Sequence, residues 1–128
     1  MTVKPDPNLD LVITLTGDER ESNNVTIAFA IGKQALDSGK SVEILLLSYG
    51  VMLSERGYGD KIDIGAPFPA IKDAIPAFLA AGGKIAVCSA CMIHNNVDQT
   101  KLLDGVKIVG ADYVADVLFA AKRSLQLN

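Results

Sequence analysis

Two cysteines three residues apart, Cys88 and Cys91, are the residues whose type and spacing point most directly to chemistry. A thiolate attacks disulfides, takes up sulfur as a persulfide or binds a metal ion, and this spacing places two thiols on neighbouring positions of one helical turn. The run Lys84–Val87 is typical of a buried strand, and we expect a short helix to follow it and to end near Asn95. A thiol at such a junction faces unpaired backbone N–H groups, which favour its ionised form.

His94 follows Cys91 by three residues, so one helical turn would bring its imidazole near the thiols. There it would act as a proton acceptor or as a charge that stabilises a thiolate. Cys88, Cys91 and His94 would supply only three metal ligands, and the chain has no other cysteine, so we expect neither a metal site nor a cofactor. The alternative is that both cysteines only fill space in the core.

Apolar runs that alternate between strand and helix patterns must position these side chains. Short buried strands are predicted at Leu9–Thr16, Val42–Leu47, Lys84–Val87 and Val106–Val109. Helices are predicted from Ser22 or Asn23 to Gly39, over Ala66–Ala81 with a kink or split at Pro76, over Val97–Leu103, and from a cap at Asp112 through Leu125. One helical turn and a loop are expected between Val51 and Asp60. This order predicts an α/β layer sandwich with a mainly parallel sheet, whose ligand crevice lies at the strands' carboxyl ends beside Cys88.

The composition fits one soluble domain. The chain has 128 residues, 49% of them hydrophobic, and a formal net charge of -3, so nothing in its charge favours nucleic acid or an anionic membrane as a partner. No apolar run is long enough to span a bilayer, and Met1–Asp10 is typical of a short extended leader and not of a signal peptide. With only two cysteines, a reducing cytoplasm is the expected location.

Several common sites are absent from the sequence. No GxGxxG follows the first strand, and neither GxxxxGK[ST] nor GxSxG occurs, so dinucleotide, nucleotide and esterase functions lose their usual support. The acidic residues on predicted loops have no defined spacing and are expected to be solvated surface carboxylates: Asp18, Glu19, Glu21, Asp60 and Asp63.

Four stretches covering nearly the whole chain resemble the DsrE/DsrF-like family and, within it, the small YchN-like proteins. They are LDLVITLTGDERESNN with VTIAFAIGKQALDSGKSVEI, then LLLSYGVMLSERGY, AFLAAGGKIAVCSACM and LLDGVKIVGADYVADVLFAAK. The strands and helices are weak evidence by themselves, because many α/β folds contain similar ones. The cysteine placed after G-x-x-apolar-x-apolar and before L-x-x-G-V is the more specific feature.

The resemblance implies a single domain over residues 1–128, with residues 1–8 as the leader, folded as a three-layer α/β/α sandwich around a sheet of about five strands. Since the sequence pattern yields four strands, we expect the fifth between Val51 and Ile64. The resemblance also implies assembly into trimers or hexamers, with the active cysteines near subunit boundaries. Cys88 matches the family cysteine that receives sulfur as a persulfide and hands it to a partner's thiol, and Cys91 matches the second cysteine of YchN-like members.

Three functional hypotheses follow. The favoured one is a cytoplasmic sulfur carrier or sulfurtransferase in which Cys88 accepts sulfane sulfur from a protein donor and Cys91 modulates or resolves the persulfide. The second is a dithiol redox protein that cycles through a Cys88–Cys91 disulfide. The third is a non-catalytic oligomeric binding module whose thiols are inert or hold a metal.

Overall fold

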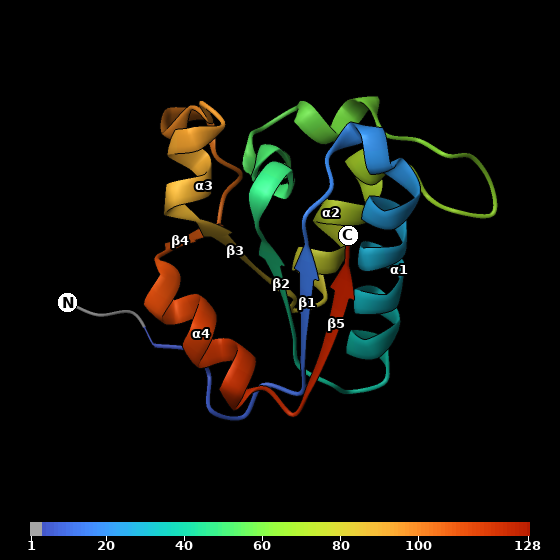
Figure 1. The fold of residues 1–128 in the computed structure, drawn as a ribbon. Coiled ribbons are helices and arrows are strands. Elements are labelled where there is room, and N and C mark those ends of the chain that lie inside the picture. Colours follow the sequence, from blue (N-terminus) through green and yellow to red (C-terminus); the bar gives the residue numbers. More distant parts are fainter. Residues whose placement is uncertain (1–3) are drawn as a thin grey trace.

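A five-stranded sheet lies between two layers of helices in the computed structural model, which describes residues 4–128 (Figure 1). The strands lie in the order β4-β3-β2-β1-β5, and every neighbouring pair is parallel. This arrangement confirms the predicted α/β sandwich and its sheet of about five strands. The first three residues of the predicted leader lie outside the described residues.

Four strands coincide with the apolar runs in the sequence, with ends within two residues of the predicted ones. They are β1 (Leu11–Leu15), β2 (Val42–Leu46), β3 (Lys84–Cys88) and β4 (Lys107–Val109). Every residue of β2 is buried, as expected for a central strand of a parallel sheet covered on both faces.

The fifth strand is not where we predicted it. β5 (Arg123–Leu127) pairs with β1 at the edge of the sheet, within the segment that was expected to be helical through Leu125. Leu125 and Leu127 pack against the core, while the alternate residues Ser124 and Gln126 are exposed. The apolar spacing of Leu118, Ala121 and Leu125 imitates a helix, but pairing with β1 decides the conformation.

The segment Val51–Ile64, where a fifth strand was expected, instead contains two 3-10 helices. The first, η2 (Ser48–Ser54), begins two residues after β2, and the second, η3 (Tyr58–Lys61), follows a left-handed Gly57. The helical turn predicted near Val51 is therefore present, and it belongs to η2.

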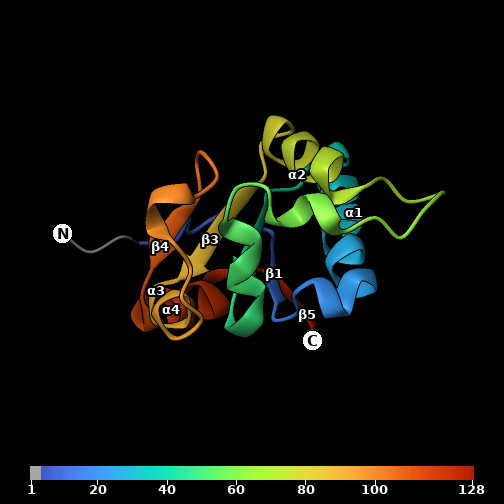
Figure 2. The ribbon, with the colours of Figure 1, turned by 90° about the horizontal axis from the view of Figure 1, so that it is seen from above.

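The four α-helices occupy three places around the sheet. Viewed from above, α1 (Ser22–Asp37) and α2 (Ile71–Ala80) lie on one side of the sheet and α4 (Ala111–Ala120) on the other (Figure 2). The short α3 (Ser89–His94) lies at the carboxyl ends of the strands, against η2. Within residues 4–128, no helix has the length and apolar character to cross a membrane.

The helix predictions need three further corrections. α2 begins at Ile71 and not at Ala66, and it continues through Pro76, which is exposed, so that its missing N–H lies on the solvent side. The piece predicted at Val97–Leu103 is reduced to a single 3-10 turn, Gln99–Lys101. Gly110 and not Asp112 occupies the N-cap of α4.

The core consists of two clusters, one on each face of the sheet. The larger lies beneath α1 and α2, and Phe29 and Phe78 from these helices meet edge to face with ring centroids 5.6 Å apart. The smaller lies beneath α4 and contains Leu9, Val12, Leu45, Ala86, Val109, Tyr113 and Val117. Because α4 is the only helix on that face among the described residues, its attachment decides whether the smaller core stays closed.

A buried polar network holds α4 to the sheet. Glu43, in the middle layer on β2, is only 2% exposed, and its carboxylate accepts a hydrogen bond from the Tyr113 hydroxyl at 2.9 Å. The Lys107 ammonium donates to the Tyr113 oxygen at 2.7 Å and lies 3.3 Å from the Glu43 carboxylate. A buried carboxylate is costly unless it is paired and hydrogen-bonded, so Tyr113 and Lys107 together make Glu43 acceptable in the core.

Replacing Tyr113 by phenylalanine keeps the ring and removes only the hydroxyl. We expect Tyr113→Phe to lower the free energy of unfolding by about 1.5–3 kcal/mol, the range for a hydrogen bond to a charged group. Urea unfolding measures this change, with Tyr49→Phe as the matched control because Tyr49 is 51% exposed and its hydroxyl is not part of this network. Equal unfolding midpoints for Tyr113→Phe and the wild type would contradict a stabilising role for the network.

Candidate functional site

The candidate site lies where β2 and β3 end side by side. In the ladder, Leu46 of β2 pairs with Val87 of β3, so the residues that follow both strands emerge at the same edge of the sheet. η2 continues from β2 and α3 from β3, and the two short helices pack against each other. Crevices outside the carboxyl ends of parallel strands are the usual ligand sites of open α/β sheets.

Cys88 is fixed by the sheet itself. It is the last residue of β3, pairs with Val109 of β4 and also forms the N-cap of α3. Only 9% of the residue is exposed. The sequence prediction that Cys88 stands at a strand-to-helix junction is therefore confirmed, and its sulfur lies in the wall of the core.

The residues of α3 differ in burial. Met92 is fully buried and anchors the helix, whereas Ile93 and His94 are exposed and Cys91 is half-buried. The short helix ends at Asn95, as predicted, and Val97 packs back into the core after the left-handed Asn96. Anchoring through Met92 therefore leaves Cys91 facing η2.

A crevice of about 390 Å³ opens between η2 and α3. It is lined by Ser48, Tyr49, Ala90, Cys91, His94 and Asn95. The structure thus brings Cys91 and His94 together in one hollow, as the three-residue spacing predicted. Cys88 is not part of this lining and lies buried behind it, three residues before Cys91.

The two thiols interact directly. The Cys91 side chain is hydrogen-bonded with the Cys88 side chain and with the Ser48 backbone. Burial raises the pKa of Cys91, the interaction with Cys88 raises it further, and the Ser48 backbone acts in the opposite direction. The environment of Cys91 therefore favours its protonated form.

The position of η2 is set by close backbone packing against β1. The Leu47 N–H donates to the Leu15 carbonyl at 3.0 Å, and Ser48 adopts a left-handed φ of 53° that starts the 3-10 helix. A Cβ on Gly50 would lie 2.2 Å from the Leu15 carbonyl oxygen, so this position must be glycine. The crevice wall formed by η2 consequently has little freedom to shift.

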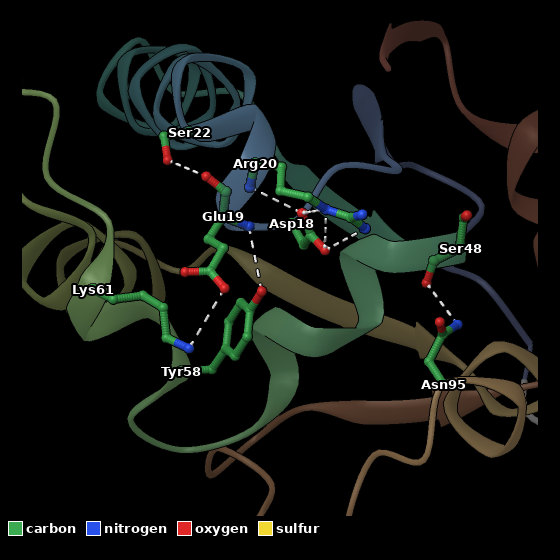
Figure 3. Close-up of polar contacts among 8 residues, drawn as sticks. All are labelled: Asp18, Glu19, Arg20, Ser22, Ser48, Tyr58, Lys61 and Asn95. Atoms are coloured by element: carbon green, nitrogen blue, oxygen red, sulfur yellow. Dashed lines mark hydrogen bonds and ion pairs between the residues drawn. The ribbon is translucent and has the colours of Figure 1, made fainter.

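Asn95 links the two short helices. Its side-chain amide donates to the Cys91 carbonyl at 2.9 Å and reaches the Ser48 carbonyl at 3.5 Å, so that one residue contacts both walls (Figure 3). Since the Ser48 backbone is also hydrogen-bonded with Cys91, the thiol is held between its own helix and η2.

A second hollow of about 370 Å³ lies on the other side of Tyr49 and includes Asp18 and Arg20. The Arg20 guanidinium lies 4.6 Å from the Tyr49 ring centroid and forms an ion pair with Asp18 at 2.9 Å (Figure 3). The prediction that Asp18 is a solvated surface carboxylate is wrong, because Asp18 is 8% exposed and caps the turn Glu19–Glu21. Hydrogen bonding from Arg20 holds the pKa of Asp18 below its usual value.

Ser48 and Tyr49 were not predicted as site residues, although the glycines around Tyr49 to Asp60 were expected to form a flexible rim of the cysteine crevice. The signal for Ser48 and Tyr49 was present, because both follow a buried strand adjacent to β3, which is the argument that identified Cys88. The glycines further along, Gly57 and Gly59, line a separate groove beside α2 and not the thiol crevice. Across residues 4–128, no three His, Cys, Asp or Glu side chains are grouped so as to hold a metal ion.

The hydrogen bond between the thiols predicts a pH effect with a definite sign. In Cys88→Ala the interaction that raises the pKa of Cys91 is lost, so we expect this pKa to fall and alkylation of Cys91 by iodoacetamide to begin at lower pH than in the wild type. Peptide mapping of the alkylated protein across a pH series measures this midpoint for Cys91 alone. His94→Gln serves as a control and leaves the midpoint unchanged, because His94 does not contribute to the shift. A midpoint that stays or rises in Cys88→Ala would contradict the contact.

Several solved structures have the same fold as this chain. Among solved structures, the chain is similar in fold to YchN from E. coli, with a TM-score of 0.70, 21% identity, and coverage of 92% of this chain and 98% of the other. A protein of unknown function from Methanobacterium thermoautotrophicum gives a TM-score of 0.67 at 17% identity, with coverage of 92% and 98% respectively. One from Bacteroides thetaiotaomicron gives 0.67 at 18% identity, with coverage of 93% and 95%.

The comparison with curated proteins finds no match. The comparison with protein families matches residues 10–127, which include all five strands and both cysteines, to the DsrE/DsrF-like family. The chain therefore belongs to the DsrE/DsrF-like family.

Proposed function

We propose that this protein accepts sulfane sulfur as a persulfide on Cys88 and passes it to the thiol of a partner protein. Membership of the DsrE/DsrF-like family supports a role of the sulfur-relay type in general. The observation that carries the finer assignment to Cys88 is its place at the end of β3 and at the N-cap of α3. The N-terminus of a helix favours a negative charge, and the thiolate is the nucleophile in sulfur transfer.

The transfer needs only thiol chemistry. The Cys88 thiolate attacks the outer sulfur of a donor persulfide, the bond between the two donor sulfurs breaks, and the donor leaves as a thiolate that takes up a proton. Delivery reverses the roles, because a partner thiolate attacks the outer sulfur on Cys88 and Cys88 leaves as the thiolate. The N-terminus of α3 favours this negative charge as well.

The crevice supports an approach past Cys91. Cys88 is only 9% exposed, and in this proposal an incoming sulfur enters the hollow between Tyr49 and His94 on its way to Cys88. His94 is exposed at this entrance and is placed to take a proton from an approaching thiol. In this proposal the location is the cytoplasm, where a reducing environment keeps both cysteines as thiols.

A dithiol redox function is the second candidate, and one observation favours it. The two side chains are hydrogen-bonded with each other, so an oxidant would find the two sulfurs close together. The two functions differ in whether the protein gains sulfur or loses hydrogen.

Intact-protein mass spectrometry after incubation with cysteine hydropersulfide, with and without reductant, separates the two functions. We expect a gain of one reductant-labile sulfur atom in Cys91→Ser and, at the earliest time points, in the wild type, and no gain in Cys88→Ser, because Cys88 provides the thiolate. Ser89→Ala, in the same helical turn, is the matched control and behaves like the wild type.

Other outcomes would contradict the assignment. If Cys88→Ser accepts sulfur as well as the wild type does, Cys88 is not the acceptor. A loss of two hydrogens by the wild type without any sulfur-bearing species in Cys91→Ser would establish the dithiol redox function. If the mass changes in none of the samples, both functions are excluded, and the protein is a binding module with inert thiols.

We further propose that the protein works as a homo-oligomer, a trimer or hexamer, with protein donors and acceptors of sulfur meeting it near subunit boundaries. Large apolar side chains that are exposed in the single chain support this proposal. Ile93, next to His94 on α3, is 71% exposed, and Phe119 on α4 is 92% exposed. These two side chains are the most exposed large apolar groups among the described residues, so they are the contacts that a neighbouring subunit would cover in this proposal.

Light scattering coupled to gel filtration tests the oligomer. We expect three or six times the mass of the single chain, and a shift toward the monomer in the double variant Ile93→Glu, Phe119→Glu, because the charges would have to be buried. Gln34→Glu, on the exposed surface of α1, is the control and keeps the wild-type mass. A monomeric wild type at micromolar concentration would refute the assembly.

A further inference from the structure

The second cysteine has a place in the site that simple acceptance by Cys88 does not use. Cys91 lines the crevice and is hydrogen-bonded with the Cys88 side chain and the Ser48 backbone. It therefore lies beside the buried sulfur that would carry a persulfide and faces the open space from which an acceptor thiol comes in this proposal. Any persulfide on Cys88 forms with a second thiol already against it.

Proximity gives Cys91 a large kinetic advantage over external thiols. Well-oriented groups within one molecule react as though present at about 10⁵ M or more, whereas a thiol in solution is present at millimolar levels. Cys88 at the N-cap and Cys91 three residues later lie about one helical turn apart, so their side chains are neighbours on the helix surface. The hydrogen bond with the Ser48 backbone lowers the pKa of Cys91 and so favours its thiolate.

We propose that Cys91 discharges a persulfide held on Cys88: when no acceptor thiol is engaged, Cys91 attacks Cys88 Sγ, hydrosulfide leaves, and a Cys88–Cys91 disulfide forms. This inference rests on the proposed acceptance of sulfur by Cys88 and adds a second fate for that sulfur. The protein then has two outputs, transfer to an engaged partner and release as sulfide.

The discharge step balances without an added oxidant. Cys91 loses its proton, its sulfur forms a bond to Cys88 Sγ, and the bond between Cys88 Sγ and the terminal sulfur breaks with its electron pair leaving on hydrosulfide. One persulfide and one thiol thus yield one disulfide and one molecule of hydrogen sulfide: the terminal sulfur is reduced, the Cys91 sulfur is oxidised, and Cys88 Sγ, bonded to one sulfur before and after, keeps its oxidation state. A dithiol reductant restores both thiols by exchange with the disulfide.

The test follows the lifetime of the loaded protein. Wild type, Cys91→Ser and Ser89→Ala are loaded with cysteine hydropersulfide and freed of donor by gel filtration. They are then held without thiol while released sulfide and intact mass are measured over time. In the wild type and Ser89→Ala we expect one equivalent of sulfide and a product two hydrogens lighter than the starting dithiol. Cys91→Ser should retain its sulfur at least about tenfold longer.

The outcomes separate this inference from the proposed function. If Cys91→Ser loads but loses sulfur as fast as the wild type, discharge by Cys91 is wrong while acceptance by Cys88 stands. If peptide mapping finds the persulfide moved to Cys91 with no sulfide released, Cys91 attacks the terminal sulfur and the inference is again wrong. If neither protein gains sulfur, acceptance by Cys88 fails, and the inference fails with it.

Discussion

The parallel pairing of β2 with β3 is the constraint on which the site depends. It brings the ends of two strands that are about 40 residues apart in sequence to the same edge, so that Ser48 and Cys88 emerge side by side. The hydrogen bonds of the Ser48 backbone with Cys91 and with Asn95 exist only because of this register. A shift of β3 by one residue would also turn its side chains to the opposite face and move the Cys88 sulfur away from Cys91.

Much of the fold could be predicted from local sequence because its central strands are buried on both faces. A short, continuous apolar run such as Val42–Leu46 is typical of a strand covered on both faces. The ends of these strands were predicted within two residues. β5 could not be predicted in this way. It lies at the sheet edge with only Leu125 and Leu127 packed inward, and its pairing with the distant β1 outweighs a local pattern that favours a helix.

The candidate site could be predicted in part for the same reason. Cys88, Cys91 and His94 lie close together in sequence, and one helical turn is enough to relate them. Ser48, Tyr49 and Arg20 come from other segments and reach the site only through the sheet and through packing of η2. The burial of Asp18 could not be predicted from its residue type. Its ion pair with Arg20, two residues later, forms only once the turn has folded.

The two thiols differ in what the structure allows them to do. Cys88 is held by the strand ladder and by the N-cap of α3, so its position is as rigid as the core. Cys91 lies on a helix of one and a half turns, anchored mainly through Met92, and it faces the crevice. The site thus pairs a fixed, buried sulfur with a more accessible one, and the two proposed roles, holding the persulfide and discharging it, follow this difference.

Tyr49 lies on a firmly packed segment of η2, but its side chain is exposed. The backbone around it cannot shift, because Gly50 lies against the Leu15 carbonyl, yet the Tyr49 side chain is 51% exposed and contacts Arg20 without entering the core. The side chain at this position can therefore be exchanged for larger, smaller or charged ones while the scaffold and both sulfurs stay in place. A single exposed residue at the rim of the crevice can accordingly be varied independently of the two sulfurs below it.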